Sequence, residues 1–225
     1  MKLENMTWKE LLGTEHTIAE RLFDGKTYPW EVLGGIGEFI TTLGPLLPEN
    51  EYRKLGKDIW IHKTARMAPG VAAAGPMIIC AGAQVRQGAF LRGKVIIGER
   101  AVVGNSCELK NAVLFDEVQV PHFNYVGDSI LGYKAHMGAG SITSNVKSDK
   151  KLVVVRDGTA EVATGRKKVG AMVGDNVEVG CGSVLNPGTV LGRGCSVYPL
   201  SSVRGTVPAG CIYKCRGEVA QRQED

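Results

Sequence analysis

An apolar residue returns at every sixth position between residues 61 and 115. The ten positions are Ile61, Met67, Ala73, Ile79, Val85, Leu91, Ile97, Val103, Leu109 and Phe115. The residue four places later is small or apolar in nine of the ten cases, and Gln119 is the exception. A period of six matches neither the 3.6-residue turn of a helix nor the two-residue alternation of a strand. The pattern therefore predicts a solenoid, in which each six-residue unit forms one flat side of a coil.

In such a solenoid the large residue fills the interior, and the small residue lies where the chain bends into the next side. Coils stacked at about 4.8 Å pair their backbone groups with the coils above and below. The composition agrees with a narrow interior and tight corners, because the chain has 30 glycines and only 6% aromatic residues. We therefore predict a mainly β fold, a parallel β-helix.

The period is interrupted twice and returns each time. It resumes at Leu131 and Met137, and again in a second long block, made of Val173, Val179, Leu185, Leu191, Val197 and Val203. Counting all blocks gives eighteen hexads, which predicts about six triangular coils with three hexads each. Residues 121–130 are polar and aromatic where the period is lost, and such departures from a regular scaffold commonly carry its chemistry.

The second interruption, residues 144–168, is an insertion rich in lysine and arginine. It is either a solvated loop or a loop that closes over a substrate groove, and the sequence leaves both interpretations open. The last residues, 211–225, are a polar tail. The β-helix itself is predicted to span residues 58–210.

Residues 1–57 do not share the six-residue period. A proline at position 29 is followed by apolar residues at helical spacing, namely Ile36, Phe39, Ile40 and Leu43. We predict a short α-helical N-terminal extension that packs on the first coil and protects its open edge. The role of this extension does not follow from the sequence.

The formal net charge of +4 is modest. It does not indicate a nucleic-acid partner, but it is compatible with small anionic substrates. No apolar run reaches membrane-spanning length, and residues 1–10 lack the apolar core of a signal peptide, so we predict a cytoplasmic protein without a membrane partner.

Cys107 and Cys195 occupy small interior positions, and Cys211 and Cys215 have no second pair at zinc-site spacing. Reduced thiols and no metal are therefore expected.

Two basic residues, Arg92 and Lys110, are eighteen positions apart. With three hexads in a coil, this spacing stacks them in neighbouring coils, about one coil spacing from each other. Two like charges held this close are unfavourable unless an anion bridges them. The pair is therefore either a phosphate site or two solvated surface cations.

Three segments make a resemblance specific. The segments GNSCELK (104–110), HFNYVGDSILG (122–132) and GAGSITSN (138–145), followed by Lys151, resemble the acetyltransferase domain of the bifunctional N-acetylglucosamine-1-phosphate uridyltransferase and glucosamine-1-phosphate acetyltransferase. The resemblance covers about residues 60–216. It implies a left-handed parallel β-helix that forms a homotrimer, with active sites between neighbouring subunits and acetyl-CoA as co-substrate. Residues 1–57 have no glycine-rich nucleotide loop, so uridylyl transfer is not expected.

The resemblance assigns the acceptor site residue by residue. Arg92 and Lys110 would hold the sugar phosphate, with Lys151 assisting from the insertion. Tyr125 and Asn145 would contact the sugar.

The resemblance also assigns the base and the acetyl-CoA site. His122 would be the general base, a role that suits imidazole near neutral pH, and Arg216 would meet the phosphates of coenzyme A. Three positions depart from the family pattern. His136 stands where the family has an asparagine near the substrate, and near coenzyme A Cys181 replaces a serine and Pro199 an alanine.

The expected reaction is acetyl transfer to the 2-amino group of a hexosamine 1-phosphate. Glucosamine 1-phosphate is favoured, and galactosamine 1-phosphate or a nucleotide-linked amino sugar remains an alternative that His136 would decide. A second alternative is a non-catalytic trimeric scaffold, or a regulatory partner of a separate sugar nucleotidyltransferase. A third is a zinc carbonic anhydrase, which needs three histidines at one metal. The four histidines here, at 16, 62, 122 and 136, do not show the spacing of such a site.

Overall fold

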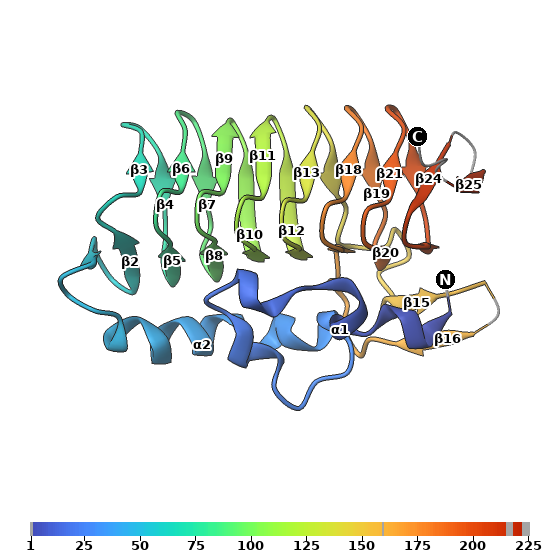
Figure 1. Ribbon diagram of the computed structural model, residues 1–225, viewed down its shortest axis with the longest axis horizontal. Helices are drawn as coiled ribbons and strands as arrows, with labels where there is room; N and C mark the ends of the chain where they lie inside the picture. Colours follow the sequence, from blue (N-terminus) through green and yellow to red (C-terminus); the bar gives the residue numbers. More distant parts are fainter. Residues whose placement is uncertain (1, 159, 215–217, 222–225) are drawn as a thin grey trace.

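The computed structural model describes residues 2–158, 160–214 and 218–221. Its strands wind into a long solenoid with three flat sides, and the N-terminal segment lies along one of them (Figure 1). The predicted fold class is confirmed: the protein is a mainly β parallel solenoid with a few short helices near its N-terminus. Among the described residues, no helix is long and apolar enough to cross a membrane.

The first side consists of parallel strands with apolar residues on both faces. In stacking order they are β2 (Ile59–His62), β5 (Met77–Ile79), β8 (Val95–Ile97), β10 (Glu108–Leu114), β12 (Tyr125–Leu131), β17 (Ala171–Val173), β20 (Thr189–Leu191) and β23 (Thr206–Val207). The strand β1 (Tyr52–Lys54) pairs antiparallel with β2 and covers the open edge of the first coil.

The second side contains β3 (Arg66–Met67), β6 (Gln84–Val85), β9 (Val102–Asn105), β11 (Gln119–His122), β13 (His136–Met137), β18 (Glu178–Val179), β21 (Ser196–Val197) and β24 (Cys211–Tyr213), with β25 (Val219–Gln221) antiparallel at the end. The third side contains β4 (Ala72–Ala73), β7 (Phe90–Leu91), the first residues of β10 and β12, β14 (Ile142–Thr143), β19 (Val184–Leu185) and β22 (Ser202–Val203).

Eight parallel strands stack on the second side of the described chain, so the solenoid has eight coils and not about six. The difference arises where the coils shorten. Val102 pairs with Gln119, and Gln119 pairs with His136, so these partners are seventeen residues apart, whereas Gln84 and Val102 are eighteen apart. The loss of one corner residue in each of these coils breaks the six-residue count without breaking the stack.

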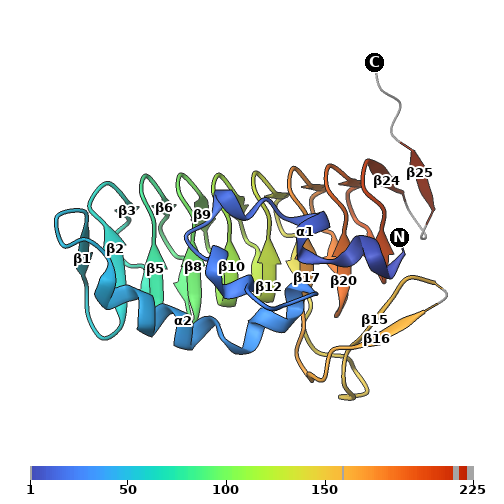
Figure 2. The same ribbon diagram turned by 60° about the horizontal axis from the view of Figure 1, so that its bottom comes forward.

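The N-terminal segment contains η1 (Leu3–Met6), α1 (Trp8–Leu11), η2 (Thr14–His16), η3 (Glu20–Phe23), η4 (Pro29–Gly34), α2 (Ile36–Leu43) and η5 (Gly44–Leu46). The sequence predicted that this segment packs on the first coil. Instead it runs along the first side, across several coils (Figure 2). The helix α2 contacts β5, β8 and β10, and η4 contacts β12. Further along the stack, Gly13 N donates to Asp175 Oδ2 at 2.8 Å, and Asp175 N donates to Leu11 O at 3.0 Å.

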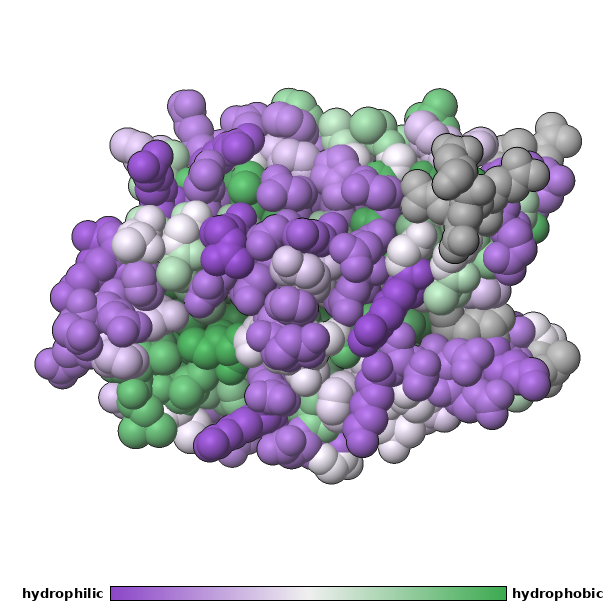
Figure 3. All heavy atoms as spheres, viewed as in Figure 1, coloured by the Kyte–Doolittle hydropathy of each residue, from purple (hydrophilic) through white to green (hydrophobic). Residues whose placement is uncertain are grey.

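The reason for this placement is an apolar row on the outward face of the first side. The row consists of Trp60, Ile78, Ile96, Val113, Ile130, Met172 and Val190, which are paired in register across successive coils and are all buried. An exposed apolar strip this long is unfavourable in water, so the N-terminal segment covers it. The face in Figure 3 is accordingly mainly hydrophilic, with hydrophobic residues gathered around α2.

The insertion leaves the solenoid after β14 and returns at β17. It contains a hairpin of β15 (Val154–Arg156) and β16 (Glu161–Ala163). Val155 of β15 is buried, as are Val153 and Val169 before and after the hairpin in the chain. Across the insertion, neighbouring coils pair residues 42 positions apart, as His136 and Glu178 do. The stack therefore continues unchanged while the insertion stands beside it.

Candidate active site

The residues predicted to form the site border the third side of the solenoid. Along one edge, which we call the polar corner, each residue directly follows a third-side strand. In stacking order the row reads Arg92, Lys110, Gly127, Ser144, Asn186 and Arg204. Tyr125 lies on the third side itself, and His122, Cys181 and Pro199 lie at the opposite edge. One face of the fold therefore brings most of the predicted residues together.

Arg92 and Lys110 are stacked in neighbouring coils, as their spacing predicted. Arg92 N donates to Leu109 O at 2.9 Å. The Arg92 guanidinium is half-exposed and donates from Nη1 to Glu108 Oε1 at 2.6 Å, and this hydrogen bond raises the pKa of Arg92. Both basic side chains line a cavity of about 580 Å³, which we call the cationic pocket.

A partly buried polar network adjoins the two cations. Asn145 Nδ2 donates to the Tyr125 hydroxyl at 3.1 Å and to Asp128 Oδ2 at 2.5 Å. Asn111 Nδ2 donates to Asp128 Oδ1 at 2.8 Å, and burial raises the pKa of Tyr125. Asn111 and Asp128 line the cationic pocket and were missed by the sequence reasoning. Their signal was a seventeen-residue spacing, which only becomes readable once the shortened coils are known.

His122 ends β11 and is exposed at the edge of the third side. Its backbone N–H donates to Asn124 Oδ1 at 3.0 Å. The buried Asn124 also donates from Nδ2 to Gly138 O at 2.8 Å and to Ser141 O at 2.9 Å. Asn124 therefore holds the corner that presents His122, and it is a further residue that the sequence reasoning missed.

Two other predicted acceptor residues lie elsewhere in the single chain. His136 is on the second side, where its Nδ1 is 2.7 Å from Glu178 Oε2, and it lines a shallow cavity with Arg100 and Lys134. Lys151 is exposed in the insertion, and it is not among the residues that line the cationic pocket.

The insertion nevertheless supplies cations to the cationic pocket. They are Arg166, Lys167 and Lys168, from its C-terminal end. The sequence showed that the insertion is basic. Which of its charges lie over the solenoid depends on how the insertion folds.

The residues predicted to contact coenzyme A are partly brought together. Cys181 is exposed, and Leu200 N donates to Cys181 O at 2.9 Å, so Cys181 and Pro199 occupy the same corner in neighbouring coils. Arg216 lies outside the described residues. In the described part of the chain, no group of three or more His, Cys, Asp or Glu side chains is arranged to hold a metal ion.

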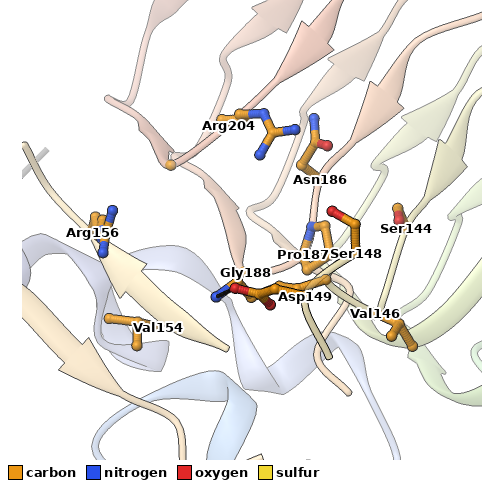
Figure 4. A pocket seen from close by; sticks show the side chains of 12 residues that line it. Ser144, Val146, Ser148, Asp149, Val154, Arg156, Asn186, Pro187, Gly188 and Arg204 are labelled. Carbon is orange, nitrogen blue, oxygen red and sulfur yellow. Dashed lines mark ion pairs between the residues drawn. The ribbon is translucent and has the colours of Figure 1, made fainter. Parts of the chain in front are cut away.

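A second cavity, of about 550 Å³, lies between the insertion and the later coils (Figure 4). Asn186 and Arg204 of the polar corner line it, as do Ser148 and Arg156 of the insertion. In Figure 4 the Arg204 guanidinium points toward the Asn186 side chain. Asn186 Nδ2 already donates to Ser202 Oγ at 3.0 Å and to Val203 O at 2.8 Å. No sequence pattern predicted this cavity.

The family model described as the GMPPB C-terminal domain matches residues 73–191, more than half of the chain. The chain belongs to this family. It is also 33% identical over 125 residues to a bifunctional sugar-1-phosphate nucleotidylyltransferase/acetyltransferase of Sulfurisphaera tokodaii, covering 56% of this chain and 31% of that protein. It is 39% identical over 104 residues to the bifunctional protein GlmU of Methanococcus maripaludis, covering 46% and 25%. These relatives confirm the resemblance drawn from the motifs.

Among solved structures, a point mutant of AntD, an N-acyltransferase from Bacillus cereus in complex with dTDP and coenzyme A, is similar with a TM-score of 0.40. The sequence identity is 17%, and the match covers 79% of this chain and 93% of that one. The chain spans between a quarter and a third of the length of the two bifunctional relatives.

Proposed function

We propose that the chain is an acetyl-CoA-dependent N-acetyltransferase that acts on the 2-amino group of a hexosamine 1-phosphate. Glucosamine 1-phosphate is the first candidate for the acceptor, and galactosamine 1-phosphate is the second. The observation that carries the proposal is that Arg92 and Lys110 line one cavity, whose wall residue Asp128 is hydrogen-bonded to Asn145 of the Tyr125–Asn145 pair. This arrangement offers cations to a phosphate and neutral hydrogen-bonding groups to a sugar. The match to bifunctional relatives whose names include acetyl transfer supports the same class.

In this proposal each group has a separate task. Arg92 and Lys110 hold the phosphate, and Tyr125 and Asn145 orient the sugar ring. His122 accepts a proton from the amine as its nitrogen attacks the thioester carbonyl carbon. The new carbon–nitrogen bond forms, the carbon–sulfur bond breaks, and coenzyme A leaves as a thiolate that takes up a proton. Holding both substrates in place removes much of the entropic cost of a two-substrate reaction.

The acetyl-CoA chain would follow the edge that carries Cys181 and Pro199, on the His122 side of the third side. Arg216 would meet its phosphates. The expected homotrimer would place a second copy of the chain against the third side, where outward-facing Phe90, Ile142 and Val184 are partly exposed. His136 faces another side, so it would join the acceptor site only from such a second copy.

Thiol release from acetyl-CoA tests the proposal when glucosamine 1-phosphate, galactosamine 1-phosphate and the two free amino sugars are offered in parallel. We expect turnover with one 1-phosphate and a much higher KM for its free sugar, because the free sugar cannot use the Arg92–Lys110 pair. Light scattering of the same sample reports its oligomeric state. A folded protein that is silent with all four acceptors would refute the proposal and would support the scaffold alternative.

A further inference from the structure

The cationic pocket carries far more positive charge than a single pair of residues. Six basic side chains line it, namely Arg92, Lys94, Lys110, Arg166, Lys167 and Lys168. The one carboxylate in its wall, Asp128, is already bonded to Asn111 and Asn145. Among the described residues, Arg92 is the one member of the six that forms an ion pair. Like charges gathered at this density repel one another unless an anion binds between them.

Half of these cations come from the insertion, and their backbone is held in place. Arg166 O accepts from Val153 N at 2.8 Å, and Arg166 N donates to Thr164 Oγ1 at 3.2 Å. Val153 is buried. The end of the insertion is therefore anchored to the protein core, and Arg166 is a part of the cavity wall with a fixed backbone.

The N-terminal segment shapes the same cavity through two glycines. A Cβ atom at Gly34, the last residue of η4, would lie 2.9 Å from Arg166 Nη1. A Cβ atom at Gly37 in α2 would lie 3.3 Å from Lys94 Cε. Each glycine thus leaves room for one cationic side chain to lie against the N-terminal segment. This segment lies outside residues 73–191, which the family model matches.

We propose that the insertion and the N-terminal segment complete the acceptor-phosphate site. Arg166, supported by Lys167 and Lys168, binds the phosphate together with Arg92 and Lys110, and Gly34 is the positioning residue that seats Arg166. The proposal rests on the proposed function, since the ligand is the phosphate group of the acceptor. It assigns a role in substrate binding to the segment whose role did not follow from the sequence.

Steady-state kinetics of the Arg166→Gln variant test the proposal. A hydrogen bond to a charged group is typically worth about 1.5–3 kcal/mol, so we expect the acceptor KM to rise by roughly 10-fold to 100-fold. The KM for acetyl-CoA should stay within about 2-fold of its normal value, because the lost interaction involves only the acceptor. Lys150→Gln is the matched control, since Lys150 is an exposed cation of the same insertion outside the pocket wall.

A second pair of variants tests whether Gly34 positions the Arg166 side chain, without removing a charge. Gly34→Ala displaces only the end of the Arg166 side chain and should also raise the acceptor KM, by a smaller factor. Gly35→Ala is its control, because the nearest atom to the new Cβ, Leu22 Cδ1, is at an ordinary 3.5 Å. Unchanged acceptor KM values in both Arg166→Gln and Gly34→Ala would overturn the proposal.

Calorimetric titration with inorganic phosphate separates this proposal from the proposed function. It needs no turnover, so it is informative even if all acceptors are silent. We expect Lys150→Gln to bind phosphate as the unmodified protein does, and Arg166→Gln to bind it at least about 5-fold more weakly. Equal behaviour of the unmodified protein and Arg166→Gln, including no binding by either, would refute the role of Arg166.

Discussion

The Ile96→Ala substitution tests whether the N-terminal segment stabilises the solenoid by covering its first side. Ile96 lies in β8 in the outward apolar row, between Ile78 and Val113 in the neighbouring coils. Its exposure is 0%, and α2 is the helix that contacts β8. The substitution removes three carbon atoms from the interface between the segment and the solenoid, and it leaves the interior of the coils untouched.

The expected loss follows from this burial. Each buried methyl or methylene contributes about 0.8 kcal/mol, so the transfer term is about 2.4 kcal/mol. The cavity left behind adds to this, and substitutions of this kind cost about 2–5 kcal/mol in all. We therefore expect the free energy of unfolding to fall by about 3–4 kcal/mol. In a chain of this size the Tm falls by about 2–4 °C for each kcal/mol of stability lost, so we expect the Tm of Ile96→Ala to be lower by roughly 6–16 °C.

Urea unfolding followed by circular dichroism measures the loss. Ile212→Ala provides the control, because Ile212 occupies an outward position on the second side, where it is half-buried and away from the N-terminal segment. The control should lose less than half as much stability. A loss below about 1 kcal/mol in Ile96→Ala would contradict the claim that the segment is held by this apolar row.

Four further outcomes are expected. His122→Ala should lower kcat by about 10²-fold to 10⁴-fold in the thiol-release assay, the usual contribution of a general base, and an unchanged kcat would remove His122 from that role. Arg92→Lys should raise the acceptor KM but not that of acetyl-CoA, because lysine lacks the planar fork that binds a phosphate with two bonds; equal losses for both substrates would contradict this division. Iodoacetamide should label exposed Cys181 before the buried cysteines, since burial raises the pKa of Cys80, for example, to about 12. Mass spectrometry locates the label, and early modification of Cys80 would show that the structure around it opens. Burial also raises the pKa of the Asp175 carboxyl, so the folded state binds the carboxyl proton more tightly than the unfolded state does. Asp175 therefore lowers the free energy of unfolding as the pH rises from about 3.9, the unfolded value, through the folded pKa. Urea midpoints measured from about pH 4 to pH 7 should therefore fall more with pH in the unmodified protein than in Asp175→Asn, and parallel pH profiles would contradict the assignment.

The acceptor residues show which contacts the spacing of residues in the sequence can predict and which it cannot. Arg92 and Lys110 were placed in neighbouring coils because eighteen residues make one regular coil, and the structure stacks them in this way. Asn111 and Asp128 escaped the same reasoning because they are seventeen residues apart, across a coil that drops a corner residue. Asn145 was assigned by resemblance, and its bond to Asp128 depends on a partner that only the shortened coil brings within reach.

The N-terminal segment shows a different limit. Part of the outward row of the first side was readable in the sequence, since Ile78 and Ile96 are eighteen residues apart and each directly precedes an inward position, whereas Val113 follows Ile96 by only seventeen. Such a row indicates that something covers it, but not what. The same limit applies to the insertion, whose cations could not be assigned to the cationic pocket before its hairpin and anchors were known.

The solenoid could be predicted from the printed residues alone, because a six-residue repeat imposes the same bend and the same inward side chain on each side of every coil, and each coil is a template for the next. The positions of the non-repeating segments became known only from the folded protein. Their positions depend on contacts between residues far apart in the chain, such as Gly34 with Arg166 and Gly13 with Asp175. No local pattern encodes these contacts, and the first of them lies in the wall of the cationic pocket.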